Sequence, residues 1–343
     1  MTTGKENQAH WGLLGHDWAV DLLKQQIIRQ ATRHAYLFCG PPGVGRRSLA
    51  LRFYQALNCQ QMAAPAEPCL ECRTCRQIER MEFPDLTVLQ AEQEGGVIKV
   101  DWVRAVRQTL WLKPFQSRYR LALLLRFQEA NENAANALLK ILEEPPENAI
   151  LILTAEAPEQ LPATISSRCE VLRLRPSPIE SLEKWLVDRK VGKEDARLLA
   201  HISAGRPGAA LRWLENGEAL KARRKRLDEL VGLLHATRVQ RFAYAEKLAD
   251  PKKRNSEPED PVHQVLMLWL SFWRDVFVQT SLPSAPLTNV DYSQKITALA
   301  GQLSSRQAQS LVSEVELAID RLGRFINARL LLEVLLLDMP RTA

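Results

Sequence analysis

The stretch Gly40-Pro-Pro-Gly43-Val-Gly45-Arg46-Arg47-Ser48 decides how the first half of the chain is expected to fold. An apolar run, 35–39, precedes it and is typical of a short buried strand, and a helical pattern follows it. Strand, glycine-rich turn and helix are the context of a phosphate-binding loop, G-x-x-x-x-G-K-[ST], because the N–H groups of the turn and of the helix N-terminus then face one anion. Gly40 and Gly45 have the spacing of that loop.

Two positions of this loop depart from the motif. Arg46 stands where the loop lysine belongs, and Arg47 puts a cation where magnesium needs a hydroxyl oxygen. Ser48 comes one residue late, which turns it about 100° away on a helix. The residues that would contact a nucleotide are therefore expected to bind it weakly or not at all; they are Gly40, Gly43, Gly45, Arg46, Arg47 and Ser48.

Composition indicates a globular chain of two or three domains. It has 343 residues, of which 46% are hydrophobic and 25% charged, and a net charge of +6. This mild positive charge is compatible with a polyanionic partner but does not require one. No apolar run reaches transmembrane length and the first ten residues lack a signal-peptide core, so we expect a soluble, cytoplasmic protein with no membrane partner.

Strands and helices are expected to alternate from 35 to 175, which is typical of a parallel α/β sheet. Predicted strands after the first are 83–89, 119–125, 149–154 and 171–174, with helices at 100–112 and 131–144. Arg126 and Phe127 follow the strand 119–125, where an ATPase of the phosphate-loop type carries an acidic residue that helps to hold magnesium. Neither side chain can ligate a metal, so we expect no hydrolysis by this chain.

Four of the six cysteines have the spacing C-x9-C-x2-C-x2-C: Cys59, Cys69, Cys72 and Cys75. Thiolates two residues apart can face one ion, and four of them close a tetrahedral zinc site that has no open position. The sequence therefore predicts a structural zinc module inserted after the loop helix. Free cysteines and a redox C-x-x-C are the alternatives, and the latter would not need the other two thiols.

Basic side chains mark two candidate surfaces for nucleic acid. Arg104, Arg107 and Trp111 share one face of the helix predicted at 100–112, and such a face can lie along a phosphate backbone. The run 221–226 holds five cations. For both sites the alternative is an ordinary solvated helix face.

The second half of the chain is predicted to be all helical. Pro176-Ser-Pro178 marks a boundary, after which we expect a small helical lid domain at 176–249, a charged linker at 250–261 and a C-terminal helical domain at 262–343. Near 330–337 the apolar residues cover almost the whole helix circumference. Such a helix is buried on all sides, either in its own bundle or against partner subunits.

Together these motifs resemble the delta-prime subunits of the bacterial DNA polymerase III clamp loader, which are AAA+ proteins. The resemblance depends on the loop, on the inserted cysteines, on Asn136-Ala-Leu-Leu-Lys140-x-Leu-Glu-Glu-Pro-Pro146, and on Thr164-Ile-x-Ser-Arg168-Cys169. It implies an AAA+ α/β domain at 1–175 with a zinc knuckle at about 59–75, a helical lid and a C-terminal collar that binds other subunits. It also implies that Arg168, flanked by Ser167 and Cys169, is an arginine finger for the ATP of a neighbouring subunit.

The same resemblance implies the partners. They are the gamma or tau motor subunits and the delta subunit, with the sliding clamp and primer–template DNA reached through the assembled complex of the polymerase holoenzyme. Motor subunits carry a sensor arginine where this chain has Gly208, and Arg206 lies two residues earlier.

Three functions follow as hypotheses. The first is a stator-like clamp-loader subunit that does not hydrolyse ATP and completes a neighbour's ATP site with Arg168. The second is an active motor ATPase of the gamma or tau type, for which magnesium-dependent turnover by the isolated chain would be decisive. The third is a monomeric zinc-containing protein that binds nucleic acid, which predicts salt-dependent DNA binding by the chain alone.

Overall fold

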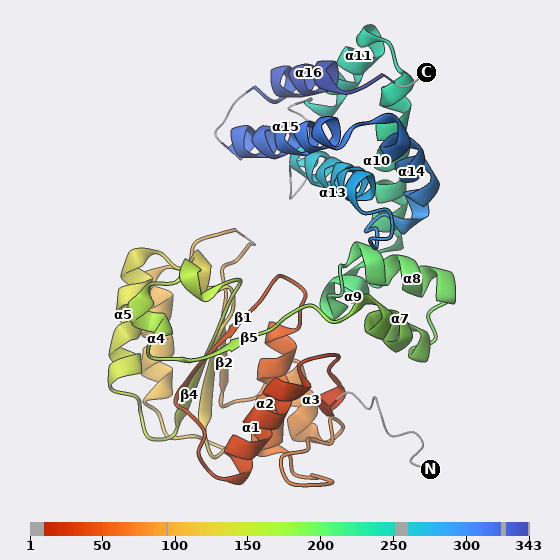
Figure 1. Ribbon diagram of the computed structural model, residues 1–343. Coiled ribbons are helices and arrows are strands. Elements are labelled where there is room, and N and C mark those ends of the chain that lie inside the picture. The colour runs from red at the N-terminus through yellow and green to blue at the C-terminus, as the bar shows by residue number, and fades with distance from the viewer. Residues whose placement is uncertain (1–9, 94, 251–259, 324–326, 342–343) are drawn as a thin grey trace, which may run out of the picture. The chain divides into compact units, whose positions relative to one another are not determined.

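Five parallel strands form the sheet of the N-terminal part of the chain, as the computed structural model shows (Figure 1). The structure describes residues 10–93, 95–250, 260–323 and 327–341. The chain divides into two units, one of residues 1–190 and 205–209 and one of residues 191–204 and 210–343, and each is treated by itself.

The strand order in the sheet is β2-β3-β4-β1-β5. The strands are β1 (Ala35–Cys39), β2 (Leu86–Leu89), β3 (Arg120–Leu124), β4 (Ala149–Ala155) and β5 (Glu170–Arg173). In the register, Leu37 of β1 pairs with Leu153 of β4 on one side and with Val171 of β5 on the other. All five predicted strands are confirmed, with ends that shift by up to three residues.

Helices cover both faces of this sheet (Figure 1). One face carries α1 (Asp17–Ile28), α2 (Arg46–Asn58) and α3 (Arg73–Glu79); the other carries α4 (Val100–Leu110), α5 (Glu132–Glu143) and α6 (Ala163–Ser166). Short 3-10 turns lie at η1 (His10–Gly12), η2 (Phe127–Glu129) and η3 (Pro158–Gln160), and α7 (Ile179–Asp188) follows the last strand. The α/β domain with a parallel sheet that the sequence predicts is therefore confirmed.

Alternate side chains of each strand enter two separate cores, because successive residues of a strand point to opposite faces. In β1, Tyr36 and Phe38 pack with the core on the α1 and α2 side, whereas Leu37 and Cys39 pack with the core on the α4 and α5 side. All five residues of β1 are buried. This explains why the strand sequences are continuous apolar runs rather than alternating ones.

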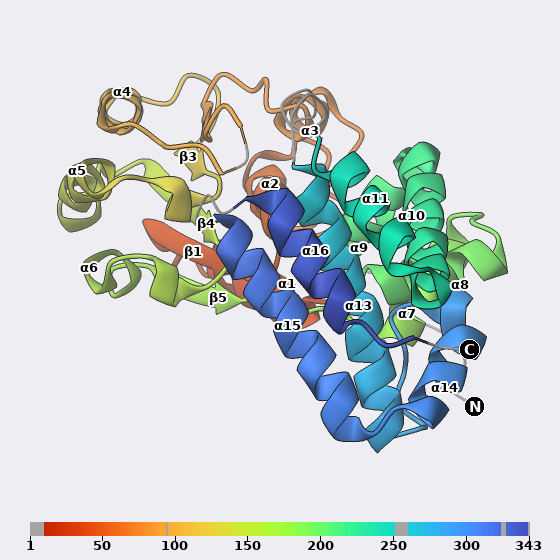
Figure 2. The same cartoon turned by 90° about the horizontal axis from the view of Figure 1, so that it is seen from above.

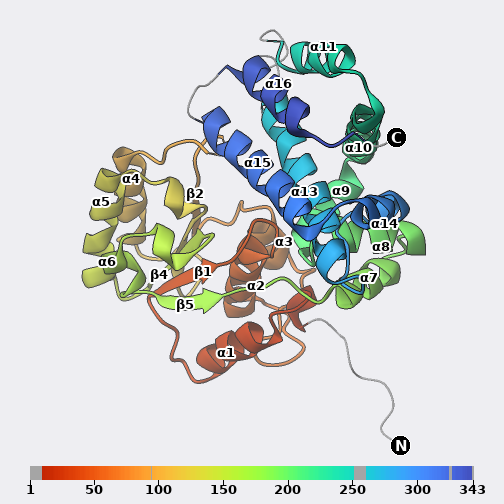
Figure 3. The ribbon, with the colours of Figure 1, turned by 45° about the horizontal axis from the view of Figure 1, so that its top comes forward.

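The second unit consists of helices in the part of the chain that the structure describes. They are α8 (Lys193–Ile202), α9 (Pro207–Glu215, which begins in the first unit), α10 (Gly217–His235), α11 (Arg238–Leu248), α13 (Pro261–Ser281), η4 (Val290–Tyr292), α14 (Ser293–Gln302), α15 (Ser305–Gly323) and α16 (Ala328–Asp338). Figures 2 and 3 show α13 running alongside α15. The fully buried rings of Trp269, Phe272 and Trp273 on α13 fill the centre of this core.

The predicted domain boundary at 249 does not coincide with the structural one. Leu227, Leu230 and Leu234 of α10 and Ala245 of α11 lie in the same hydrophobic core as α13, α15 and α16. These two helices therefore belong to the C-terminal unit, not to a separate lid at 176–249. Of the predicted linker 250–261, residues 251–259 lie outside the described residues, and Pro261 already begins α13.

Helix α16 is also less buried than its composition predicts. Leu331, Leu332, Leu335 and Leu336 face the core, whereas Leu330, Val334 and Leu337 are about half exposed. Two helices, α15 and α16, lie in the apolar stretch from 302 to 339. The described residues include no helix long and apolar enough to cross a membrane.

Candidate functional site

The phosphate-loop stretch connects β1 to α2, at the carboxyl edge of the sheet. Arg46 is the first residue of α2 and is buried, whereas Arg47 and Ser48 are exposed. The structure thus has the strand–turn–helix context that the sequence predicts.

Residues 205–209, just after α8, pack on this loop. The Gly208 N–H donates to the Gly43 carbonyl at 2.8 Å, and Arg206 Nη1 donates to the Pro42 carbonyl at 3.4 Å. Gly43 has φ of +81°, and a Cβ added to it would meet Ala209 N at 2.7 Å, so a side chain is excluded here on both grounds. The loop is therefore in backbone contact with the segment that carries Gly208.

A cation and a phenyl ring occupy the carboxyl end of β3, where an acidic residue would hold magnesium. Arg126 pairs through Nε with Glu129 Oε1 at 2.8 Å, and its N–H donates to Thr154 Oγ1 at 2.9 Å. Phe127 is buried in the core. The nearest carboxylate in sequence, Glu129, also accepts the Gly95 N–H at 3.0 Å. Arg126 thus forms an ion pair with the carboxylate that follows it most closely in the sequence. The sequence analysis did not single out Glu129.

Arg168 lies between the end of α6 and the start of β5. Its Nη2 donates to Glu143 Oε1 at 2.9 Å, and its Nη1 donates to the Thr164 carbonyl at 3.0 Å. The side chain of Arg168 remains 38% exposed. Glu143 is the last residue of α5, 25 positions earlier in the chain, and sequence reasoning missed this contact because nothing in the local pattern marks it.

The residues that flank Arg168 have structural contacts. Ser167 Oγ donates to the Thr164 carbonyl at 3.4 Å, and Cys169 packs partly buried against the core under α4 and α5. Burial raises the pKa of the Cys169 thiol to about 12, so this sulfur is protonated at neutral pH and is a poor nucleophile.

Arg168 and the loop lie at opposite edges of the same sheet. Glu170, two residues after Arg168, pairs with Tyr36 near the start of β1, whereas the loop begins at Gly40 after the end of β1. Four residues of strand separate Tyr36 from Gly40, about 13 Å at 3.3 Å per residue. The Arg168 guanidinium is thus directed to a surface away from the loop of its own chain.

The four predicted cysteines come together. The Sγ atoms of Cys59, Cys69, Cys72 and Cys75 all lie within 4.8 Å of one another. Backbone N–H groups donate to three of these sulfurs: Cys69 N to Cys59 at 3.3 Å, Cys72 N to Cys69 at 3.3 Å, and Cys75 N to Cys72 at 3.4 Å. Such bonds favour thiolates, which are the form that binds metal. The donor set fits a metal ion with four sulfur ligands.

Side-chain hydrogen bonds and an ion pair hold this cysteine module against the rest of the domain. Trp11 Nε1 donates to the Ala66 carbonyl at 2.9 Å, and Gln55 Nε2 donates to the Cys75 carbonyl at 2.8 Å. Lys24 of α1 pairs with Glu67. The module therefore packs against α1 and α2 on the face of the sheet away from α4.

In the predicted nucleic-acid surface, Arg104 of α4 and Trp111, the residue after α4, are exposed to solvent, while Arg107 is half-buried. Arg104 pairs with Asp101 at 3.1 Å. In the run 221–226, Arg223 is buried and pairs with Asp291 at 2.7 Å. The run 221–226 thus includes a structural arginine. The α4 surface has one exposed arginine, Arg104, and one half-buried arginine, Arg107.

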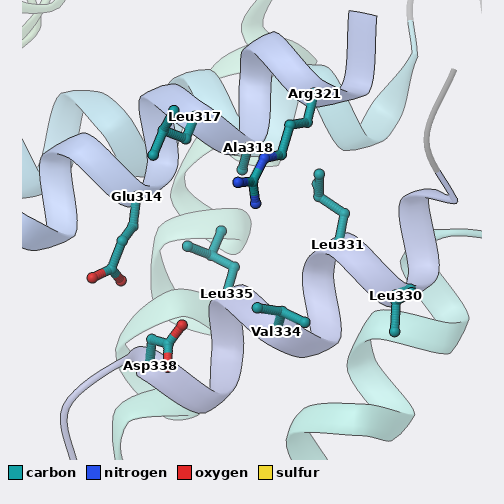
Figure 4. A pocket seen from close by; sticks show the side chains of 9 residues that line it. All are labelled: Glu314, Leu317, Ala318, Arg321, Leu330, Leu331, Val334, Leu335 and Asp338. Atoms are coloured by element: carbon teal, nitrogen blue, oxygen red, sulfur yellow. The ribbon is translucent and has the colours of Figure 1, made fainter. Parts of the chain in front are cut away.

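A groove lies between α15 and α16 (Figure 4). Its volume is about 260 Å³, and the buried residues that line it are Ala318, Leu331 and Leu335. Leu317, Leu330 and Val334 stand at its apolar rim, and Glu314, Arg321 and Asp338 add charge around it. This is the surface on which the half-exposed side chains of α16 gather.

Comparisons with known proteins agree on one family. The family model described as "DNA polymerase III, delta subunit" matches residues 15–178. A DNA polymerase III subunit delta' of Pseudomonas aeruginosa is 37% identical over 237 residues, which cover 67% of this chain and 70% of that protein. One of Bacillus subtilis is 29% identical over 316 residues, which cover 92% and 93%. A DNA polymerase III subunit tau of Bacillus subtilis is 35% identical over 158 residues, 46% of this chain and 27% of that protein.

Proposed function

The chain belongs to the DNA polymerase III delta' subunit family, and we propose that it is the clamp-loader subunit that completes a neighbour's ATP site without hydrolysing ATP itself. Its partners in this proposal are the gamma or tau motor subunits and the delta subunit, and the assembled complex acts on the sliding clamp and primer–template DNA. The observation that carries the proposal is the position of Arg168 at the sheet edge opposite the chain's own loop.

Three features support the absence of hydrolysis. Arg47 replaces the hydroxyl that would ligate magnesium, and Arg126 with Phe127 replaces the acidic pair. The Arg126–Glu129 ion pair neutralises the carboxylate closest to that position. Without a loop hydroxyl or an acidic residue after β3, this chain has no oxygen ligands at those positions that would hold magnesium in place to neutralise the developing charge.

Arg168 has the properties that an arginine finger requires. A guanidinium is always charged and planar, so it can spread over phosphate oxygens and stabilise charge in the transition state. Its side chain is partly exposed, and Arg168 lies at the edge of the sheet opposite the loop. It therefore acts on the ATP of an adjacent subunit, with Ser167 and Cys169 fixing the backbone around it.

Zinc is the metal that we propose for the cysteine module. Cys59, Cys69, Cys72 and Cys75 would hold it as thiolates, and a site with four sulfur ligands leaves no position for substrate. Its role is structural, because it closes the loop between α2 and α3.

The C-terminal unit is proposed to bind the neighbouring subunits. Leu330, Val334 and Leu337 form a half-exposed apolar stripe on α16 beside the groove of Figure 4. Apolar side chains that are exposed together on one face of a helix are typical of an interaction surface. This supports the collar role and the second of the two predicted environments for 330–337, burial against partner subunits. Contact of Arg104 and Arg107 with DNA inside the assembled complex remains a proposal.

The test is reconstitution of the clamp loader with Arg168→Ala. Loss of an arginine finger costs on the order of 10³–10⁵ in hydrolysis rate at the site that it serves. We expect hydrolysis at that one site to fall by at least about 10³-fold, with a loss of clamp loading, measured as DNA-stimulated ATPase and as clamp transfer to primed DNA.

Arg173→Ala is the matched control for that experiment. Arg173 is an exposed arginine in the same domain and also pairs with a glutamate, Glu159, at 2.7 Å. Its replacement should leave both activities unchanged. If the ring that contains Arg168→Ala keeps wild-type ATPase and loading, the assignment of Arg168 is wrong.

The similarity to a tau subunit favours one second candidate, an active motor ATPase. That function predicts magnesium-dependent ATP turnover by the isolated chain. The chain's lack of a loop lysine, a loop hydroxyl and an acidic residue after β3 argues against it.

A further inference from the structure

We propose that Glu143 is a positioning residue for Arg168: it holds the guanidinium in the orientation in which the arginine meets a neighbour's nucleotide. This inference rests on the proposed function of Arg168. The observation behind it is the ion pair between Glu143 Oε1 and Arg168 Nη2 at 2.9 Å, which joins two segments 25 residues apart.

The two ends of this ion pair are held by well-packed elements. Glu143 terminates α5, whose Leu138, Ile141 and Leu142 are buried in the core against the sheet. Arg168 follows α6, whose Ile165 is fully buried in the same core. Helices α5 and α6 pack against each other, as the view in Figure 2 also shows. The ion pair therefore connects backbones that are already fixed, and only the two side chains need to be ordered.

The arginine is held at two points and keeps donors in reserve. One N–H of Nη2 is used by Glu143, and one N–H of Nη1 is used by the Thr164 carbonyl. A guanidinium has five N–H donors in a fixed planar fork, so three donors remain for phosphate oxygens. Fixing two donors in advance fixes the plane in which the other three lie. The arginine side chain therefore loses less conformational entropy when it contacts the nucleotide.

The end of α5 is an unfavourable place for the Glu143 carboxylate, and its ion pair with Arg168 offsets this. Glu143 lies at the C-terminus of α5, where the helix dipole already concentrates negative charge and disfavours a carboxylate. The Thr164 carbonyl, in the single turn α6, is a second acceptor for this guanidinium. The cation of Arg168 thus sits between one negative helix end, one backbone carbonyl and one carboxylate. These groups attract the guanidinium, which explains why it is held against the domain surface rather than extended into solvent.

Glu143→Gln is the experiment, with Glu144→Gln as its matched control. Glu144 is the next residue, is exposed, and loses the same charge on substitution. Both are assembled into a clamp loader in which the other ATP sites carry a substituted loop lysine, so that only the site completed by Arg168 turns over. Because exposed ion pairs contribute modestly, we expect Glu143→Gln to lower kcat at this site about two- to fivefold. KM for ATP should be unchanged, and Glu144→Gln should behave as wild type.

The double variant separates positioning from a general effect on the domain. If Glu143 acts through Arg168, Arg168→Ala with Glu143→Gln should be no slower than Arg168→Ala alone. Glu143→Asp, which keeps the charge, should recover part of the loss. A second readout needs no assembly: in the free chain, NMR should detect slow rotation of the Arg168 guanidinium in wild type and in Glu144→Gln, and fast rotation in Glu143→Gln.

Failure of the two proposals can be told apart. If Arg168→Ala leaves the rate unchanged, the proposed function of Arg168 is wrong and Glu143 positions nothing. If Arg168→Ala abolishes turnover but Glu143→Gln does not lower kcat, only the inference on Glu143 is overturned. An increase in kcat with Glu143→Gln overturns it too, since the carboxylate would then hold the arginine back from the nucleotide.

Discussion

Asp85 is a fully buried carboxylate at the start of β2 that organises the loop between α4 and β3. It accepts the N–H groups of Phe115, Gln116 and Ser117 at 2.7–3.0 Å and the Ser117 hydroxyl at 2.9 Å. Arg120 Nη2 lies 3.3 Å from it. The loop 115–117 is thus fixed by one side chain, while Phe115 itself is 77% exposed.

Replacing Asp85 by Asn should lower the unfolding free energy by about 2–4 kcal/mol, because the N–H groups of the loop lose a charged acceptor and Arg120 loses its counter-ion. Urea denaturation measures this. Asp101→Asn is the control, since the pair of Asp101 with Arg104 is largely exposed and should contribute under about 0.5 kcal/mol. Equal losses for the two variants would contradict the role given to Asp85.

The same variant has a pH signature. Burial alone would raise the pKa of Asp85, but the N–H donors of Gln116, Phe115 and Ser117 outweigh it and hold the pKa below its ordinary value. A lowered folded pKa gives stabilisation that is complete above the unfolded pKa of about 3.9 and is lost as pH falls through the folded pKa. The stability difference between wild type and Asp85→Asn should therefore be constant down to about pH 5 and shrink below about pH 4.

Among single residues, those whose chemistry departs from a motif could be predicted from the sequence, and those defined by a partner could not. Arg47 and Phe127 are informative because the motif fixes what their positions require. The Glu143–Arg168 pair and the Gly43–Gly208 contact depend on which segments the fold brings together. Twenty-five and 165 residues separate these partners, and no local pattern encodes such distances.

At the scale of elements, the cysteine module gives a direct prediction. Cys72→Ser should reduce bound zinc from about one ion per chain to near zero, and it should lower the unfolding free energy, because metal binding stabilises the folded chain. Elemental analysis of purified protein measures the first effect, and urea denaturation measures the second. Cys169→Ser is the control, since Cys169 lies outside the four-sulfur cluster. Wild-type protein without zinc would contradict the choice of metal.

The strands and helices of the sheet domain could be predicted well because each apolar run is short and bounded. Predicted helix 131–144 became α5 (Glu132–Glu143), begun by the Asn131 side chain, which accepts the Ala134 N–H, and ended before Pro145. The N-terminal region was harder. Within residues 11–30, α1 (Asp17–Ile28) begins only after a separate turn at His10–Gly12, because Gly12 and Gly15 adopt positive φ and interrupt the helix.

At the scale of the whole molecule, the half-exposed stripe on α16 predicts where assembly occurs. Val334→Asp should weaken binding to the partner subunits by about 30- to 1000-fold, since a charge would be buried at an apolar interface. The thermal melting of the isolated chain should hardly change, because Val334 is 47% exposed in it. Size-exclusion chromatography with light scattering measures the assembly.

Val239→Asp is the matched control for that prediction. Val239 is an equally apolar side chain on α11 and is 77% exposed. It should leave assembly intact. A complex that forms normally with Val334→Asp would place the collar contacts on another surface.

Domain boundaries were the least predictable property of the chain. The charged stretch after Leu248 looks like a linker, yet the apolar residues of α10 and α11 complete the core around Trp269. Arg241 of α11 shows how far this integration goes. Its buried guanidinium donates to the carbonyls of Leu233 and Leu336, near the C-terminal ends of α10 and α16. Such contacts between distant helices decide where a domain begins, and hydrophobic periodicity within one helix does not reveal them.

The contact between Gly208 and Gly43 joins residues 205–209 to the phosphate loop through a bond within one chain. A segment held on the same chain is present at its target at an effective concentration in the millimolar range or above. This bond uses the Gly43 carbonyl and not the N–H groups with which such a loop faces an anion. A side chain at Gly43 would force the two segments apart, since a Cβ there would meet Ala209 N at 2.7 Å.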